Sequence, residues 1–214
     1  MDQPPDFLYR FRRAGSSLAY LLNEIRGVLF CATSSQLNDP FDGLGLVPQE
    51  QAKVILNFPR GPSSFSIDKH WATACFSTKW NCAPMWAHYT DNNNGVCLVY
   101  DYPVLNQKAI TGGAAFSSPL GEIRAKCHLE RVRYYDELPA HFDDLKDALF
   151  AKTSDWKYEC EWRLVIQTPT AIGKESSGFA ISILGTLRKI LLGTALDAST
   201  INCIEKLGTL SIRL

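Results

Sequence analysis

Glu159 and Glu161 lie two residues apart in a segment, 156–166, that also contains two tryptophans and a tyrosine. We predict that this segment is one continuous strand, which would place both glutamates and Arg163 on the same face. Aromatic side chains around a pair of carboxylates are typical of the wall of a functional pocket. The same pattern also suits a solvated strand face on which Arg163 pairs with the carboxylates. The residues of the segment leave both interpretations open.

Two further polar residues occupy predicted strands elsewhere in the chain. Arg10 lies in a first strand, 7–12, on the face opposite three aromatic side chains. Its planar guanidinium can either remain in solvent or bind an anion. Ser77 ends a second apolar strand, 71–77. We predict that Arg10, Ser77 and Glu161 converge on one cleft although they are far apart in the sequence.

The chain contains none of the common motifs for binding phosphates, dinucleotides or catalytic zinc. Its four histidines, at positions 70, 88, 128 and 141, lack the spacing of metal ligands, and no two cysteines form a C-x-x-C pair. We therefore expect no metal site. His88 is expected to be a partly buried histidine next to Trp86, while a cysteine–histidine pair assembled in space stays possible.

The composition is that of a single globular domain, 1–214. Of its 214 residues, 46% are hydrophobic, and the formal net charge is zero. The absence of a basic excess argues against tight non-specific binding to nucleic acid. Seven cysteines are spaced singly, mostly in apolar segments. We expect free thiols, most of them buried, in a reducing compartment, and hence a cytoplasmic location.

The first residues do not resemble a signal peptide, and no apolar run is long enough to span a bilayer, so we expect no membrane partner. Short apolar runs alternate with helical patterns, which predicts an α+β domain with many short strands. Residues 111–121, rich in Gly, Ala and Ser, are the best candidate for a mobile loop. Predicted helices cover 18–26, 49–58, 84–89, 142–149 and 198–207; further strands cover 28–32, 96–100, 127–135, 179–184, 189–192 and 210–214.

Residues 38–42 read Asn-Asp-Pro-Phe-Asp and residues 159–163 read Glu-Cys-Glu-Trp-Arg. Together with several other short pieces of the chain, they resemble a bacterial family known as domain of unknown function 2971. The combination of Asn-Asp-Pro-Phe-Asp with Glu-x-Glu-Trp-Arg is specific to that family. The matching pieces extend from about residue 8 to residue 163, and more loosely to 193. They are Leu-Tyr-Arg-Phe-Arg (8–12), Asn-Asp-Pro-Phe-Asp (38–42), Cys-Phe-Ser (75–77), Met-Trp-Ala-His-Tyr (85–89), Gly-Val-Cys (95–97) and Tyr-Glu-Cys-Glu-Trp-Arg (158–163).

A more distant similarity suggests a reaction. An arginine on the first strand, a serine that ends a later strand and a late Glu-x-Glu resemble the Arg-Ser-Glu pattern of mono-ADP-ribosyltransferases. The resemblance implies a split, mostly antiparallel β-core with flanking helices. It also implies that Arg10 holds a phosphate or ribose of NAD, and that Ser77 supports the active-site strand and the ribose. Glu161 would be the catalytic glutamate, and Glu159 would orient or deprotonate the acceptor.

The same resemblance places aromatic residues around the nicotinamide. The expected NAD-binding residues, besides Arg10 and Ser77, are Tyr9, Phe76, Trp86, His88 and Tyr89. Cleavage of the nicotinamide–ribose bond passes through an oxocarbenium-like state, which a nearby carboxylate stabilises. The family usually has Ser-Thr-Ser at the serine strand, where this chain has Ser-Thr-Lys at 77–79.

The sequence thus predicts an NAD-dependent mono-ADP-ribosyltransferase, with NAD as substrate and an unidentified protein or nucleic acid as acceptor. Such an enzyme would serve as a toxin or in phage defence, with a possible antitoxin or immunity partner. Simple NAD hydrolysis is a variant of this reaction. A non-catalytic module that binds a nucleotide or peptide in the same cleft is an alternative, and a structural or antitoxin-like protein is another.

Overall fold

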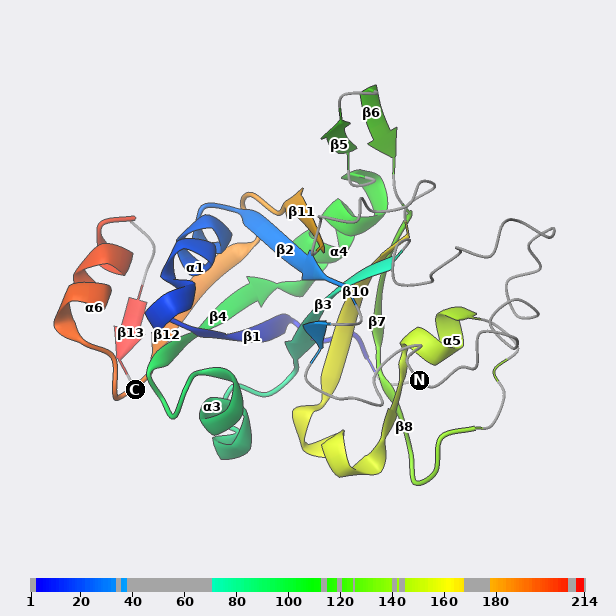
Figure 1. Ribbon diagram of the computed structural model, residues 1–214, viewed down its shortest axis with the longest axis horizontal. Helices are drawn as coiled ribbons and strands as arrows, with labels where there is room; N and C mark the ends of the chain where they lie inside the picture. The colour runs from blue at the N-terminus through cyan, green and yellow to red at the C-terminus, as the bar shows by residue number, and fades with distance from the viewer. Residues whose placement is uncertain are drawn as a thin grey trace.

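The computed structural model describes residues 3–33, 36–37, 71–112, 115–118, 121–124, 126–139, 142, 145–167, 178–207 and 211–213. In these residues the protein is α+β, as expected, with a nine-stranded, mostly antiparallel sheet flanked by helices (Figure 1). The predicted helix 49–58 lies outside the described residues.

One half of the sheet is built on β1 (Phe7–Arg13) and β4 (Gly95–Asp101), which pair antiparallel along their whole length. β12 (Leu187–Leu192) lies on the other side of β4, and β13 (Ser211–Arg213) adds a parallel strand beyond it. Both faces of β4 are buried, which explains why its sequence is a continuous apolar run rather than an alternating one.

The other half of the sheet is built on β3 (Trp71–Ser77) and β10 (Glu161–Gln167), which pair antiparallel. β7 (Lys126–Arg131) pairs with the far edge of β10. β2 (Val28–Ala32) and β11 (Gly178–Ser182) pair with each other and continue the sheet beyond β3. The resulting order is β11-β2-β3-β1-β4-β12-β13, with β10 and β7 attached through β3.

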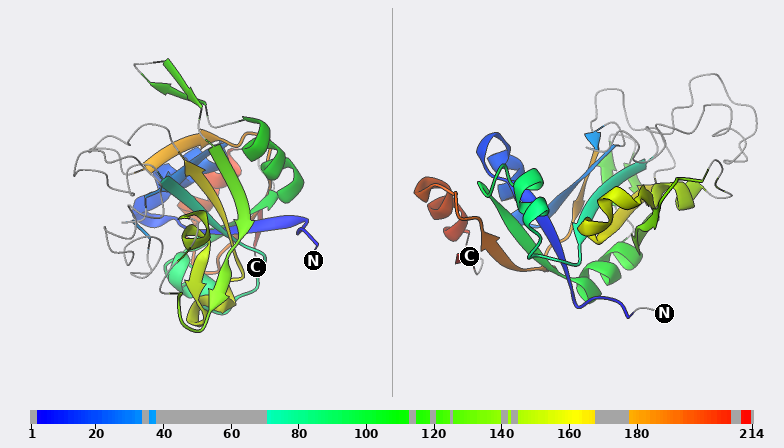
Figure 2. Two further views of the ribbon diagram at one scale, coloured as in Figure 1. Left: turned by 90° about the vertical axis from the view of Figure 1, so that its right-hand side faces the viewer. Right: turned by 90° about the horizontal axis from the view of Figure 1, so that it is seen from below.

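The sheet splits along one edge of β3. On this edge β3 pairs with β1 at Tyr9–Ser77 and with β2 at Ala32–Thr73, a single position in each case. β1 and β3 therefore diverge beyond Tyr9, and the two halves of the sheet open like a V (Figure 2). This divergence leaves room between the two strands for side chains that neither half of the sheet covers.

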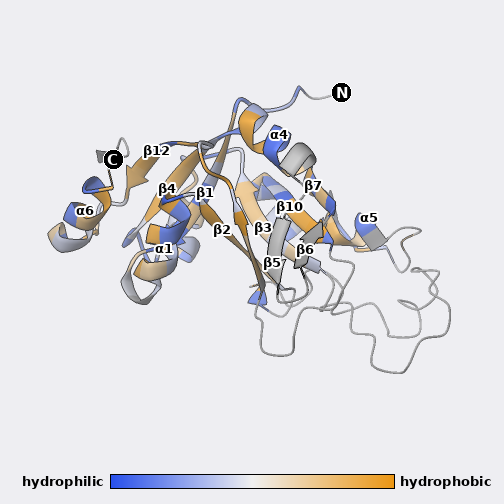
Figure 3. Ribbon diagram, turned by 90° about the horizontal axis from the view of Figure 1, so that it is seen from above, coloured by the Kyte–Doolittle hydropathy of each residue, from blue (hydrophilic) through white to orange (hydrophobic). Residues whose placement is uncertain are grey.

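Helices cover both faces of the sheet. α1 (Leu18–Ile25), α4 (Tyr102–Gly112) and α6 (Ala198–Glu205) contribute buried residues to the largest core cluster. α3 (Ala83–Tyr89) covers the opposite face of β1 and β4, and α5 (Leu145–Leu149) covers that of β10. Hydrophobic residues dominate β4 and β12, whereas α1 and α6 also carry hydrophilic residues (Figure 3).

Local signals account for several helix ends. Gly27 adopts a φ of 93°, a left-handed conformation that ends α1 where predicted. Pro84 lies in the first turn of α3, also as predicted. Asp197 accepts a hydrogen bond from the backbone N–H of Thr200 and caps α6. α4 was not predicted, because its apolar residues do not form a continuous stripe along the helix.

Smaller elements occupy the connections. Described parts of the predicted mobile loop 111–121 belong to regular elements: α4 ends at Gly112, and β5 (Ala115–Ser118) pairs antiparallel with β6 (Gly121–Arg124) in a two-stranded sheet that projects from the body of the protein (Figure 1). The predicted strand 127–135 is interrupted at Val132, because β7 pairs with β10, whereas the N–H of Arg133 donates to the carbonyl of Phe150 and β8 (Arg133–Tyr135) pairs with β9 (Ala151–Thr153). The remaining elements are η1 (Gly15–Ser17) and η5 (Ser154–Glu159), both of which are 3-10 helices.

The prediction of one continuous strand over 156–166 is wrong. Its first part is η5, and the chain then turns at Cys160, which adopts a left-handed φ of 46° and donates its N–H to the carbonyl of Lys157. β10 begins only at Glu161. Glu159 therefore does not lie on the strand face of Glu161 and Arg163, although tertiary structure brings the two carboxylates together.

All seven cysteines are free thiols, but the expectation that most are buried is wrong. Cys31 and Cys97 are buried, Cys203 is exposed, and the other four are partly exposed. Of the partly exposed cysteines, Cys75 lines a pocket, Cys82 precedes α3, Cys127 is near the start of β7 and Cys160 lies between η5 and β10, so an apolar sequence context does not guarantee burial. No helix in the described part of the chain has the length and apolar character needed to cross a membrane.

Gly95, the first residue of β4, lies opposite Arg13 of β1, and we predict that Gly95→Ala destabilises the fold. An added Cβ would lie 2.3 Å from the carbonyl oxygen of Arg12, so the strand pair would have to separate. Overpacking of this kind costs about 1–3 kcal/mol in the free energy of unfolding, measurable by urea denaturation. Gly15→Ala is the control, because its methyl group would meet no atom within 4 Å. Equal urea midpoints for the two variants would contradict the prediction.

Candidate functional site

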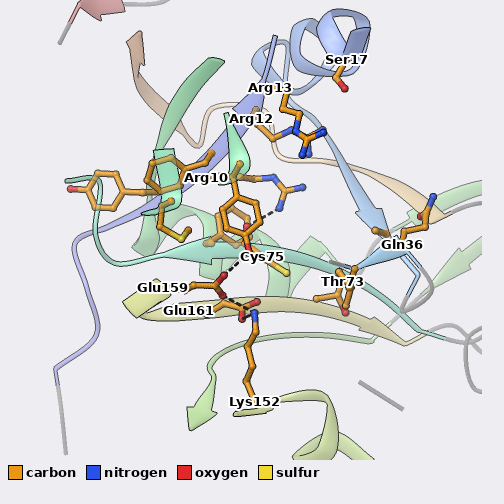
Figure 4. Close-up of a pocket in the computed structure, with 17 residues that line it drawn as sticks. Arg10, Arg12, Arg13, Ser17, Gln36, Thr73, Cys75, Lys152, Glu159 and Glu161 are labelled. Carbon is orange, nitrogen blue, oxygen red and sulfur yellow. Dashed lines mark hydrogen bonds and ion pairs between the residues drawn. The ribbon is translucent and has the colours of Figure 1, made fainter. Parts of the chain in front are cut away.

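A pocket of about 390 Å³ opens where β1 diverges from β3. Its volume lies within the range of small-molecule sites, roughly 300–1,000 Å³. Strands β1, β2, β3, β9 and β10 contribute to its wall, together with α3 and η5 (Figure 4). Charged groups line both ends: Arg10, Arg12 and Arg13 at one, Lys152, Glu159 and Glu161 at the other.

Lys152 joins the two carboxylates at the lower end of the pocket in Figure 4. Its ammonium donates to Oε2 of Glu159 at 2.7 Å and to Oε2 of Glu161 at 3.2 Å. At most 3% of each of the three side chains is exposed. The ammonium also lies 4.7 Å from the centre of the Trp156 ring. A buried cation thus compensates the carboxylates, which would otherwise repel each other.

Glu161 is held by a second cation. Arg163 donates from Nε to Oε1 at 2.8 Å and from Nη2 to Oε2 at 3.0 Å, the paired geometry in which arginine binds a carboxylate best. Nη1 of Arg163 donates to the carbonyl of Leu149. Burial by itself would raise the pKa of Glu161, but the charges of Arg163 and Lys152 lower it to about 2. Glu161 is therefore ionised, with both oxygens engaged.

Glu159 has the opposite electrostatic character. Its Oε1 accepts a hydrogen bond from the hydroxyl of Tyr89, which also lines the pocket. Burial raises the pKa of Glu159; Lys152 partly offsets this effect, and the negative charge of Glu161 adds to it. The two neighbouring carboxyl groups thus have pKa values shifted in opposite directions. This arrangement lets one group stay charged while the other exchanges a proton.

Ser77 does not line the pocket but supports the backbone that carries Glu159 and Glu161. Its hydroxyl donates to the carbonyl of Glu159 at 2.6 Å and accepts from the N–H of Lys79 at 2.9 Å, and the side chain is completely buried. The N–H of Glu161 donates to the hydroxyl of Tyr134. These bonds hold the backbone turn at Cys160, which aims both glutamates at Lys152.

Arg10 reaches the pocket from the opposite face of the sheet. On β1 it belongs to the face of Leu8, but its guanidinium bridges the split and donates to the carbonyls of Cys75 at 2.8 Å and Phe30 at 3.3 Å. It also lies 5.5 Å from the centre of the Phe76 ring. The split in the sheet therefore lets Arg10 and Glu161 line one cavity although their strands present them on different faces.

Glu24 of α1 anchors the arginine end. Its carboxylate forms ion pairs with Nε of Arg10 at 2.9 Å and Nε of Arg12 at 3.1 Å, and accepts from the hydroxyl of Tyr100. Arg13 is exposed and is bonded only weakly, at 3.5 Å, to the carbonyl of His88. Among the described residues that line or anchor this end, three guanidinium groups thus face one carboxylate, which pairs with Arg10 and Arg12 only, and an excess of two positive charges remains.

The structure gathers most, but not all, of the expected site residues. Six of them line the pocket: Tyr9, Arg10, Phe76, Tyr89, Glu159 and Glu161. Ser77 lies directly behind it. Trp86 is instead buried against Phe11, edge to face at 5.3 Å, because its apolar ring completes the core under α3. His88 points into solvent on the exposed side of α3, so it is neither partly buried nor part of the pocket.

Several residues of the site were missed in the sequence. Lys152 follows directly on a buried apolar run, 148–151, and a lysine in that position signals a buried partner. Glu24 lies on the apolar stripe of α1, three residues after Leu21, which is a similar signal. Arg12 and Cys75 carried no comparable signal, since alternation on a strand also occurs at solvated positions. Among the described residues, no three His, Cys, Asp or Glu side chains are grouped to hold a metal ion.

The matched family covers part of this site. Residues 85–164 match a family described as "Protein of unknown function (DUF2971)", which supports the family expected from the sequence motifs. The matched region extends from α3 into β10 and contains Tyr89, Lys152, Glu159 and Glu161, whereas Arg10 lies outside it. No curated protein and no solved structure gave a match.

We predict that Lys152→Met destabilises the protein in a pH-dependent way. Removing one partner of a buried ion pair costs about 3–5 kcal/mol, which we expect in the free energy of unfolding at pH 8. The loss should be smaller at pH 5. The raised pKa of Glu159 means that the folded state binds its proton more tightly, so stability is regained as the pH falls and Glu159 becomes neutral.

The measurement is urea denaturation at both pH values, with Lys108→Met as the control. Lys108 is exposed on α4 and does not line the pocket. Its replacement should change the free energy of unfolding by less than about 0.5 kcal/mol at either pH. An equal loss at pH 5 and pH 8 for Lys152→Met would show that Lys152 does not compensate Glu159.

Proposed function

We propose that this pocket binds NAD and breaks the nicotinamide–ribose bond, transferring ADP-ribose to an acceptor macromolecule, a protein or nucleic acid. The observation that carries the proposal is the distribution of charge. The arginine end has an excess of two positive charges, while the other end holds two carboxylates balanced by Lys152 and Arg163. A diphosphate that joins two riboses has the complementary shape and charge.

The chemistry of the reaction suits this division. Arginine binds phosphate oxygens through charge-assisted hydrogen bonds, and Arg12 and Arg13 are more exposed than Arg10. A ribose placed at the other end would lie beside Glu159, where a carboxylate stabilises the positive charge of an oxocarbenium-like state. Tyr9 and Tyr89 line the space between and offer aromatic surface to the nicotinamide.

One observation favours a second candidate, a non-catalytic module that binds a nucleotide in the same pocket. Both glutamate side chains are about 3% exposed, and their charges are already compensated. A protein that only binds NAD would gain stability with the ligand but release no nicotinamide. NAD hydrolysis, with water as acceptor, is the variant of the enzyme proposal that would release nicotinamide without labelling a macromolecule.

We predict that the purified protein releases nicotinamide from NAD and that Arg12→Gln weakens NAD binding. Loss of one hydrogen-bonded charge contact costs about 1.5–3 kcal/mol, which corresponds to an increase in the dissociation constant of roughly 10- to 100-fold. Nicotinamide release is followed by chromatography, and binding by calorimetry. Arg26→Gln is the matched control, since Arg26 is an exposed arginine at the end of α1 that does not line the pocket. Equal affinity of both variants for NAD would refute the assignment of the diphosphate to this end.

Cys75 gives a direct test of where NAD binds. Its partly exposed thiol lies in the pocket wall, whereas Cys203 is exposed on α6, outside the pocket. We predict that saturating NAD slows alkylation of Cys75 by iodoacetamide several-fold and leaves the rate at Cys203 unchanged. Peptide mass spectrometry measures both rates in the same sample. Unprotected Cys75 would place NAD elsewhere.

A further inference from the structure

Tyr89 and Glu159 come from different elements and meet at the pocket. The hydroxyl of Tyr89 on α3 donates to Oε1 of Glu159 at the end of η5, across 70 residues of sequence. Both residues line the cavity. Tyr89 is half-buried, whereas only 3% of the Glu159 side chain is exposed. Tyr89 is therefore the more exposed residue of this hydrogen-bonded pair.

The oxygens of Glu161 are less available for chemistry. Oε1 accepts from Nε of Arg163, and Oε2 accepts from both Nη2 of Arg163 and Nζ of Lys152. A substrate hydroxyl would have to displace a cation from this carboxylate. Glu159 contacts the shared Lys152 ammonium through Oε2 only. Its Oε1 accepts a hydrogen bond from the hydroxyl of Tyr89, and a hydroxyl proton can be transferred along such a bond.

We propose that Tyr89 and Glu159 are the catalytic residues that remove the proton of the acceptor, and that Glu161 and Lys152 are positioning residues. The proposal rests on the proposed NAD reaction and deepens it. Glu159 keeps a role expected from the sequence, the deprotonation of the acceptor. The proposal adds Tyr89 to this step and reassigns Glu161 from catalytic glutamate to positioning residue. It also defines the acceptor chemically, as a group with a removable proton, such as a hydroxyl, an amine or water.

A lone pair of the acceptor forms the new bond to the ribose carbon that carried nicotinamide. The broken carbon–nitrogen bond leaves its electron pair on the nicotinamide nitrogen, which loses its positive charge. The acceptor proton passes to the oxygen of Tyr89 while the Tyr89 proton passes to Oε1 of Glu159, and Glu159 later returns a proton to solvent by the reverse path.

Several ionisable groups surround Glu159 and govern the pH at which it works as a base. Lys152 lowers its pKa, and Glu161 raises it, so removing the charge of Glu161 moves the pKa of Glu159 down. The groups that face the pair from the packed elements are Tyr89 of α3, Tyr134 of β8, Lys152 of β9, Tyr158 of η5, and Glu161 and Arg163 of β10.

The test compares NAD cleavage and acceptor labelling across pH for three variants and the parent. Glu159→Gln and Tyr89→Phe should each lower kcat by about 10²–10⁴-fold with little change in KM for NAD, the usual effect of removing a general base. Glu161→Gln should lower kcat much less than Glu159→Gln does, and it should shift the acid limb of the pH profile to lower pH. If Glu161→Gln does not fold, the double change Glu161→Gln with Arg163→Gln removes one charge of each sign and serves instead.

Tyr158→Phe is the matched control. Tyr158 lies next to Glu159 on η5, and the described groups that bind the Glu159 carboxylate are Tyr89 and Lys152 instead. A parent protein that cleaves NAD, with Tyr89→Phe as active as Tyr158→Phe, would overturn this inference and leave the proposed function standing. Inactive, folded Glu161→Gln beside active Glu159→Gln would do the same. A parent that releases no nicotinamide would overturn both.

Discussion

The four buried charges of Lys152, Glu159, Glu161 and Arg163 form a set that is stable only when it is complete. Taking each ion out of water costs several kcal/mol, and partners at hydrogen-bond distance recover that cost. An incomplete set leaves an uncompensated charge in the interior. β9, β10 and η5 therefore have to take up their positions together, because each supplies at least one member.

The same constraint explains the unusual backbone between the two glutamates. On a continuous strand, Glu159 would lie on the same face as Glu161, roughly 6.5–7 Å along the strand. The left-handed turn at Cys160 instead ends η5 and takes Glu159 off the strand, and the hydroxyl of Ser77 holds the turn through the carbonyl of Glu159. A small hydroxyl at the end of β3 thus positions the charges without contacting them.

An element or contact can be predicted from the sequence when the residues that determine it are close together in the chain. β2 and β3 have the predicted boundaries, since apolar runs and the residues that flank them decide a strand locally. The ladder from Glu161–Ser77 to Gln167–Trp71, and the split beside it, depend on contacts between distant segments. The partnership of Glu24 with Tyr100 spans 76 residues, and that of Tyr89 with Glu159 spans 70. No periodicity in the sequence carries such information. The local pairing of Arg163 with a carboxylate could be predicted, because the residues are two positions apart, whereas the long-range partners could not.

Charge compensation also separates the two ends of the pocket in what they can do. The arginine end is preorganised with unbalanced charge, so an anion bound there neutralises a field that already exists. The carboxylate end is neutral before any ligand arrives, and Arg163 holds the pKa of Glu161 far below that of its neighbour. A positive charge that develops at this end is stabilised only if a carboxyl group there is deprotonated to a carboxylate, or if a carboxylate separates from the cation that it pairs with. Glu159, whose burial raises its pKa and whose hydroxyl partner lines the pocket, is the member of the set able to change its protonation without dismantling the rest.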